Sequence, residues 1–281
     1  MKYLPAAAFV AFIGTLVSLS PVAEASPWTQ DQGEYFLQLG ESFYHASTYR
    51  DGEGVIREGD GYTSLTTYTY GEVGLWDDLH GQFYVPFVFA RANWGNEQFD
   101  EWSFGDAQFS IQASPLDFEV PTSVRLETKI PLYTLPDRPQ APAPGDNQID
   151  FTLWLSVGGG LHAMEIPLYF YLDGGYTYRT EWNFDPQFPG GDFSDALVYH
   201  AEAGYTIADT FDVGLMSSAV FPIDPNYAAG IDESYIIAGP SLYWPVTDRI
   251  AVDFGGYFTP YSRNSGTGWS LSAGVALING E

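Results

Sequence analysis

The chain has 281 residues, with 36 acidic against 10 basic side chains and a formal net charge of −26 at pH 7. This charge excludes proteins that bind nucleic acid or an anionic membrane surface through positive patches. Acidic chains that stay disordered have few aromatic residues, whereas Tyr, Phe and Trp make up 17% of this sequence. There are no cysteines, so the predicted folded protein is held together without disulfide bonds.

The N-terminal residues have the pattern of an export signal. Lys2 precedes an apolar run over residues 6–20, and Ala23 and Ala25 fit the small-x-small pattern of a cleavage site. The run is short for a membrane-spanning helix, which needs about 20 apolar residues. We therefore expect residues 1–25 to be a signal peptide and residues 26–281 to form the exported domain. An N-terminal membrane anchor is the alternative.

The exported part contains about twelve segments in which apolar and polar side chains alternate. In residues 106–114, for example, Phe109 and Ile111 alternate with Gln108 and Ser110. This period of two is typical of β-strands with two different faces. The segments are 35–46, 62–76, 82–90, 106–114, 123–132, 149–160, 168–179, 196–205, 211–221, 235–244, 250–258 and 269–278.

The connections between these segments alternate in length. Short ones are expected at 76–81, 115–121, 161–167, 206–210 and 245–249, and long ones at 47–61, 91–105, 133–147, 180–195, 222–233 and 259–268. Outer-membrane barrels have short periplasmic turns and long extracellular loops. Several segments reach ten residues, whereas strands of soluble sandwiches usually have about 5–6. We therefore predict an all-β fold: a transmembrane antiparallel up-and-down β-barrel of about 12 strands in the outer membrane of a Gram-negative bacterium.

The first short connection contains two acids and a histidine. Asp77, Asp78 and His80 lie between two alternating segments, so we expect them to cap a tight periplasmic hairpin. A catalytic or metal-binding role for the three residues is the alternative. The acids elsewhere have no spacing typical of a calcium loop, and we predict neither a metal site nor a cofactor.

The polar face of the predicted strands should line the lumen, because charged side chains are costly against hydrocarbon. On β-strand parity, Arg125, Glu127 and Lys129 share one face, and the neighbouring strands should bring Asp106 and Asp150 close to them. These charges could filter or contact solutes, or they could form a self-neutralising network that supports the barrel. The predicted lumen residues are Glu72, Asp106, Arg125, Glu127, Lys129, Asp150, Asp173, Arg179 and Glu202.

Aromatic residues share the inward parity of these charges. They are Tyr84, Trp154, Tyr169, Tyr171 and Tyr257, which would either suit small aromatic or partly apolar solutes or simply fill space. We predict a channel for passive uptake of small solutes, without enzymatic activity. The alternatives are a plugged structural or adhesive barrel that acts through its acidic loops, and a hydrolase built on His200. The segment "SPWTQDQ" before the first strand is too short for a plug, which favours an open or side-chain-filled lumen.

Several motifs resemble a known family. The stretches "GEVGLWDDLHGQFYVPFV", "FGDAQFSIQAS", "LDGGYTYR", "HAEAGYTIADTFDVG" and "YSRNSGTGWSLSAGV" resemble outer-membrane transporters that are encoded with phenol and aromatic (meta-cleavage) degradation pathways. The resemblance implies a single-chain barrel for hydrophobic or aromatic compounds. Its partners would be outer-membrane lipid, a small-molecule solute and the outer-membrane assembly machinery, although this chain ends in "VALINGE" and not in an aromatic residue. The solute and the oligomeric state stay open.

Overall fold

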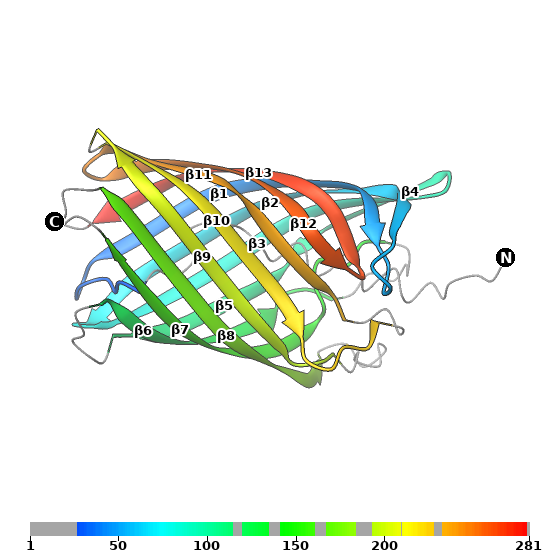
Figure 1. The fold of residues 1–281 in the computed structure, drawn as a ribbon, viewed down its shortest axis with the longest axis horizontal. Helices are drawn as coiled ribbons and strands as arrows, with labels where there is room; N and C mark the ends of the chain where they lie inside the picture. The colour runs from blue at the N-terminus through cyan, green and yellow to red at the C-terminus, as the bar shows by residue number, and fades with distance from the viewer. Residues whose placement is uncertain are drawn as a thin grey trace.

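The computed structural model describes residues 27–114, 120–134, 141–160, 167–183, 193–208, 210–227 and 232–279. These residues form a closed antiparallel barrel whose strands tilt steeply against its axis (Figure 1). Its described strands are β1 (Tyr35–Arg50), β2 (Ile56–Trp76), β3 (Leu79–Trp94), β4 (Glu97–Phe104), β5 (Asp106–Ala113), β6 (Thr122–Pro131), β7 (Gln148–Gly160), β8 (Leu168–Asn183), β9 (Ala196–Ile207), β10 (Phe211–Pro222), β11 (Ser234–Thr247), β12 (Ile250–Arg263) and β13 (Ser265–Asn279).

The strand order confirms the predicted up-and-down barrel. Chain neighbours pair with one another, and the sheet closes where β1 pairs with β13, with Tyr35 opposite Asn279. Closure leaves the spanning strands without an open edge, which hydrocarbon would not tolerate. Among the described residues there is no helix that is long and apolar enough to cross a membrane.

Strands β4 and β5 together occupy one position in the barrel. Residues 97–104 of β4 pair with the extracellular half of β3, and residues 108–113 of β5 pair with its periplasmic half. The break falls at Gly105, whose backbone N–H still donates to the carbonyl of Pro86 at 3.0 Å. The thirteen described strands therefore correspond to the twelve positions that the sequence predicts.

Three of the expected long loops are wrong, because the strands continue through them. The described structure has only residues 51–55 between β1 and β2, residues 95–96 between β3 and β4, and Asn264 between β12 and β13. The long β3–β4 hairpin projects beyond the barrel (Figure 1). Polar cross-strand pairs such as Arg91 and Asp100, 2.8 Å apart, continue the ladder into water, so the apolar alternation stops before the strands end.

The barrel is inside-out compared with a soluble protein. Along the strands, Leu39, Leu155 and Leu215 expose 60%, 60% and 64% of their surfaces, whereas Gln38 and Gln112 expose 1% and 0%. Exposed aromatic residues gather near both strand ends, including Tyr35 and Trp76 at one end and Trp182 and Trp269 at the other. An outer apolar band between two aromatic girdles is the arrangement of a barrel in a lipid bilayer.

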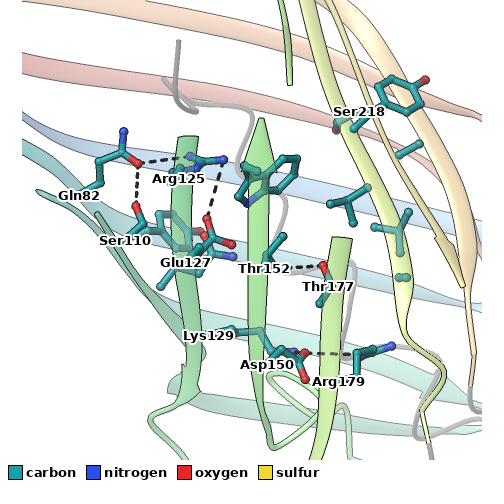
Figure 2. Close-up of a pocket in the computed structure, with 18 of the residues that line it drawn as sticks. Gln82, Ser110, Arg125, Glu127, Lys129, Asp150, Thr152, Thr177, Arg179 and Ser218 are labelled. Atoms are coloured by element: carbon teal, nitrogen blue, oxygen red, sulfur yellow. Dashed lines mark hydrogen bonds and ion pairs between the residues drawn. The ribbon is translucent and has the colours of Figure 1, made fainter. Parts of the chain in front are cut away.

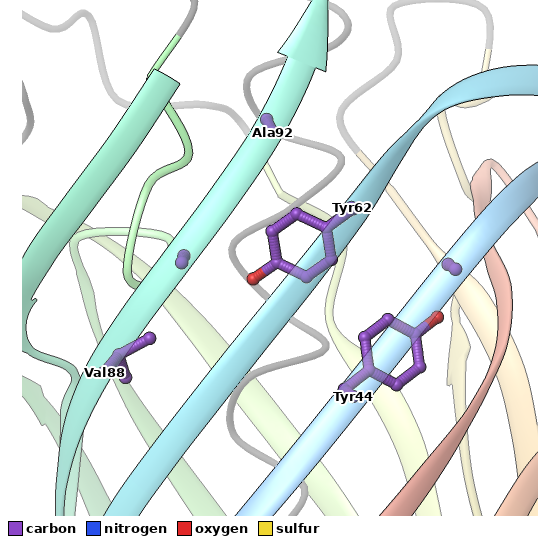
Figure 3. Close-up of a cluster of buried hydrophobic side chains, with 6 residues drawn as sticks. Tyr44, Tyr62, Val88 and Ala92 are labelled. Atoms are coloured by element: carbon purple, nitrogen blue, oxygen red, sulfur yellow. The ribbon is translucent and has the colours of Figure 1, made fainter. Parts of the chain in front are cut away.

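Tyrosine side chains fill the lumen beside β1, β2 and β3. Tyr44 and Tyr62 lie on neighbouring strands and pack with Val88 and Ala92 of β3 (Figure 3). A second group, Tyr68, Tyr70 and Tyr84, lies nearer the short-turn end. Gly40 permits this packing, because a Cβ at its position would clash with the ring of Tyr68. This half of the lumen is largely packed, and the larger of two cavities in the described lumen lies mostly on the other side.

Candidate functional site

A cavity of about 150 Å³ lies in the lumen, mostly against β5 to β10 (Figure 2). One part of its lining is charged and the rest is aromatic, aliphatic or neutral polar. The charged members are Arg125, Glu127, Lys129, Asp150 and Arg179, and among the aromatic members are Tyr70, Tyr84, Trp154 and Tyr235. The inward parity predicted for β6 is confirmed, because Arg125, Glu127 and Lys129 all line this space.

An ionic cluster lies at the extracellular side of the cavity. The Nζ of Lys129 lies 2.6 Å from Oδ2 of both Asp146 and Asp150, and 4.0 Å from Oδ2 of Asp106. The guanidinium of Arg179 lies 2.5 Å from Asp146 and 3.6 Å from Asp150. The register of β6 between β5 and β7 makes this possible, as the sequence predicts. Two cations thus hold three carboxylates, which offsets part of the cost of removing these charges from water.

Asp146 reaches this cluster because its loop folds into the barrel. Residues 141–145 are buried, and the backbone N–H of Asn147 donates to the hydroxyl of Tyr133 at 2.6 Å. Gly145 passes so close to Asp106 and Tyr133 that a Cβ would clash with both. The expectation of a solvated loop at 133–147 is therefore wrong for its described second half, whose small and apolar residues pack inward. Burial opposes the charge of Asp146, but Lys129 and Arg179 outweigh it and lower the pKa of this carboxyl.

Arg125 forms a second polar group deeper in the lumen. Its Nη1 donates to Oε1 of Gln82 at 3.3 Å, and its Nη2 lies 4.0 Å from Glu127. Ser110 also donates to Gln82, at 2.8 Å, and the guanidinium lies 4.9 Å from the ring centroid of Trp154. Arg125 Nε–H is buried without an acceptor among the described residues.

A third polar group lies on β8 and β9, nearer the periplasmic end than Arg125. It consists of Asp173, His200 and Glu202. The hydroxyl of Tyr169 donates to Glu202 at 2.6 Å, and that of Tyr171 lies 3.0 Å from Nε2 of His200. Asp173 is fully buried next to His200 in the strand register. The predicted inward parity of Asp173 and Glu202 is confirmed, but neither residue lines the cavity.

The segment before β1 lies against the inner wall at the periplasmic end of the lumen. Pro27 is buried and packs against Gly158 of β7, and its carbonyl accepts a hydrogen bond from Ser114 at 3.4 Å. The carbonyl of Trp28 accepts one from Gln112, also at 3.4 Å. The segment thus runs along the inner wall from β7 to β5.

The other end of this segment is held by β2 and β3. The backbone N–H of Gln30 donates to Nδ1 of His80 at 3.0 Å, and its side chain donates to Glu72 at 2.9 Å. Gly74 lies against the backbone of Asp31, where a Cβ would clash. The N-terminal piece, predicted to be too short for a plug, therefore lies on the inner wall and narrows the periplasmic end of the lumen. A few extended residues, at about 3.3–3.6 Å each, suffice to span this part of the inner wall.

The hairpin interpretation of Asp77 and Asp78 is confirmed, but that of His80 is wrong. Asp77 and Asp78 form the two-residue turn between β2 and β3, and Asp78 adopts a φ of 61°, a left-handed conformation that Asp tolerates. His80 already belongs to β3 and points into the lumen, where it lies 2.8 Å from Gln82. Its role is to seat the N-terminal segment.

The nine predicted lumen residues therefore separate into distinct places. Asp106 belongs to the ionic cluster, through Lys129. The five that line the cavity are Arg125, Glu127, Lys129, Asp150 and Arg179. Glu72 holds the N-terminal segment, and Asp173 and Glu202 support the wall below. The prediction did not include Asp146, because it lies in a connection and has no strand parity. No three His, Asp or Glu side chains within the described ranges are placed to hold a metal ion.

Comparisons with known proteins support the fold. No protein-family model matches the chain, and none of the curated proteins matches it significantly. Among solved structures, an outer membrane channel from Pseudomonas putida F1 has a TM-score of 0.74 at 11% identity, covering 93% of this chain and 100% of that one. The translocator domain of autotransporter NalP from Neisseria meningitidis has a TM-score of 0.54 at 8% identity, with coverages of 89% and 90%. The NanC porin has 0.53 at 12%, with 86% and 98%.

The fold, the apolar outer band and these likenesses define the chain as an outer-membrane β-barrel of a Gram-negative cell. The similar structures include channels and an autotransporter domain. The fold therefore fixes the class, and the contents of the lumen must decide the function.

Proposed function

We propose that this barrel is a channel for passive uptake of small solutes that combine an aromatic ring with a polar or anionic group. The observation that carries this proposal is the cavity of about 150 Å³ beside Arg125 and Trp154. An apolar cavity of similar volume in another protein holds a benzene molecule. Here the aromatic part of the lining would contact the ring of the solute, and the guanidinium of Arg125, which also lines the cavity, would attract its polar or anionic group.

The path of such a solute runs between two closures. On the extracellular side, residues 141–147 cover the cavity through the contacts of Asp146 with Lys129 and Arg179. On the periplasmic side, residues 27–31 lie along the inner wall and narrow the lumen. We infer that both segments move during passage, because the cavity itself fits one small molecule. The channel is then selective rather than a wide aqueous pore.

The resemblance to transporters encoded with phenol and aromatic (meta-cleavage) degradation pathways supports the same solute class. Its motifs include the β2–β3 hairpin and β5, whose residues Gln82 and Ser110 position Arg125. Export through cleavage of a signal peptide at residues 1–25 would place Pro27 near the new N-terminus. The segment along the inner wall would then be a short terminal arm.

The proposal is tested by solute uptake into proteoliposomes that contain the refolded barrel. Benzenesulfonate keeps its charge at all working pH values, so it does not leak through lipid, and methanesulfonate is the matched solute without a ring. We expect benzenesulfonate to enter faster, and Arg125→Gln to reduce this preference while Arg57→Gln, on an exposed loop pair, leaves it unchanged. Equal rates for both solutes, or no entry of either, would contradict the proposal.

Two other functions are weighed against this one. An adhesive barrel would act through its acidic loops and would show no uptake. A serine hydrolase would need a serine oxygen within hydrogen-bond reach of His200. Ser218 lies opposite His200 in the register of β9 and β10, and Nε2 of His200 lies 3.0 Å from the hydroxyl of Tyr171. The channel therefore remains the function that the lumen supports best.

A further inference from the structure

One acidic side chain of the spanning strands lies on the outer, lipid-facing surface of the barrel. Glu41 of β1 is exposed on the outer surface, with the same orientation as Leu39 and Phe43. Tyr35 of the periplasmic girdle is six residues away along the strand, and Phe43 already contacts Trp269 of the extracellular girdle. Glu41 therefore lies between the two girdles, at the level of the hydrocarbon.

No other charged residue of the described spanning strands has this position. The charges discussed above point into the lumen, and Arg91 lies beyond the girdle residue Trp102, where it pairs with Asp100. The described residues give the Glu41 carboxylate no hydrogen bond or ion pair. An ionisable side chain within a membrane is costly and normally has a partner. Lipid tails supply none, so we look for a partner outside this chain.

The surface around Glu41 is suited to close contact with another protein. Its cross-strand neighbours are Thr67 on β2 and Ala273 on β13. Small and hydroxyl-bearing residues let two membrane proteins approach closely and hydrogen-bond. By contrast, the outer face of β7 presents Leu153 and Leu155, which suit lipid. We call the patch formed by Leu39, Glu41, Phe43, Thr67 and Ala273 the Glu41 face.

We propose that the Glu41 face is a dimer interface with a second copy of this chain. Two copies in one membrane can be related by a two-fold axis along the membrane normal, which makes each residue meet its equivalent at the same depth. Two Glu41 side chains at the axis need no cation, because one protonated carboxyl donates a hydrogen bond to the other. This fits a described outer surface that offers no cation between the girdles.

The absence of native cysteines makes the test specific, because each introduced thiol is unique. Single variants Thr67→Cys and Ala273→Cys report on the Glu41 face, and Ala201→Cys on the outer surface of β9 is the matched control. With the full-length barrel in membranes, oxidation should produce disulfide-linked dimers of the first two variants and not of the control. Heat-dependent gel mobility shows that each variant is folded.

A second change tests whether Glu41 itself holds the dimer. We expect Glu41→Leu to reduce crosslinking of Thr67→Cys several-fold, whereas Glu41→Gln should retain most of it, because amides also hydrogen-bond in pairs. Crosslinking no greater than that of Ala201→Cys would overturn the dimer, and so would unchanged crosslinking with Glu41→Leu. A different partner with a cation at this depth would give the first of these results.

Discussion

The two mouths of this barrel are closed by different chemistry. On the extracellular side, an inward-folded loop is held by buried ion pairs, with Asp146 between Lys129 and Arg179. On the periplasmic side, residues 27–31 are held by hydrogen bonds from Ser114 and Gln112 and to His80, and by packing against glycine. The first closure is part of the connection between two strands, whereas the second precedes β1 and would be an arm tethered at one end after the proposed cleavage of residues 1–25.

This difference indicates how each closure can open. The loop between β6 and β7 can only shift, and every shift must separate buried charges, which is costly without replacement partners. The arm can leave the lumen as a unit, because its hydrogen bonds can be replaced by water. We therefore expect the periplasmic arm to control whether the lumen is open, and the ionic loop to control which solutes and ions pass.

Deletion of residues 27–31 should have the largest effect. Removing the arm frees the inner wall from Gly158 to His80, so single-channel conductance in planar bilayers should rise several-fold. A matched control replaces the same five residues by a flexible Gly/Ser segment, which keeps the length but loses Pro27 and Gln30. This control should also conduct more than the native chain. Native conductance in both variants would show that the arm does not obstruct the pathway.

Neutralising Asp146 should have the next largest effect. Asp146→Asn leaves Lys129 and Arg179 with fewer negative charges at the cavity, so the loop should loosen and ion selectivity should move toward anions. Reversal-potential measurements in a salt gradient check this shift. Asp51→Asn removes a carboxylate of the same charge from an exposed extracellular turn, where Asp51 pairs with Arg57, and it should leave selectivity unchanged. An equal shift in both variants would assign the effect to surface charge alone.

His80→Ala should give an intermediate opening. The variant removes the acceptor of the Gln30 backbone N–H but keeps the contacts of Pro27 and Trp28. Conductance recordings should show more frequent openings of the same size as in the deletion variant. His45→Ala, on the outer surface beside Trp269, is the control that changes a histidine outside the lumen. If the two histidine variants behave alike, His80 does not seat the arm.

The sequence predicts some residues of the candidate site and not others. The inward parity of Arg125 and Lys129, and the neighbourhood of Lys129, Asp106 and Asp150, follow from the period of two and from strand order. The contacts of residues 27–31 with the inner wall do not follow from the sequence pattern, because they depend on how β2, β3, β5 and β7 are staggered relative to one another. Glu41 shares parity with Leu39 and Phe43 in the sequence, so its outward position could be predicted by testing every charge.

The smallest effect is expected in the projecting β3–β4 hairpin. Arg91→Gln removes the exposed pair with Asp100, and solvent-exposed ion pairs contribute little to stability because water screens them. Neither conductance nor selectivity should change, because the pair lies outside the lumen, and unfolding in denaturant should shift only slightly. A marked change in conductance would mean that the hairpin takes part in gating.

The central claim is that two independent closures lie in series along one lumen. It is tested most directly by single-channel conductance of the native barrel, the 27–31 deletion, Asp146→Asn and their combination. Closures in series predict that the combined variant conducts more than the sum of the two single increases, because each single variant leaves one obstruction. If all four proteins conduct equally while folded, the lumen is not the pathway and the account is contradicted.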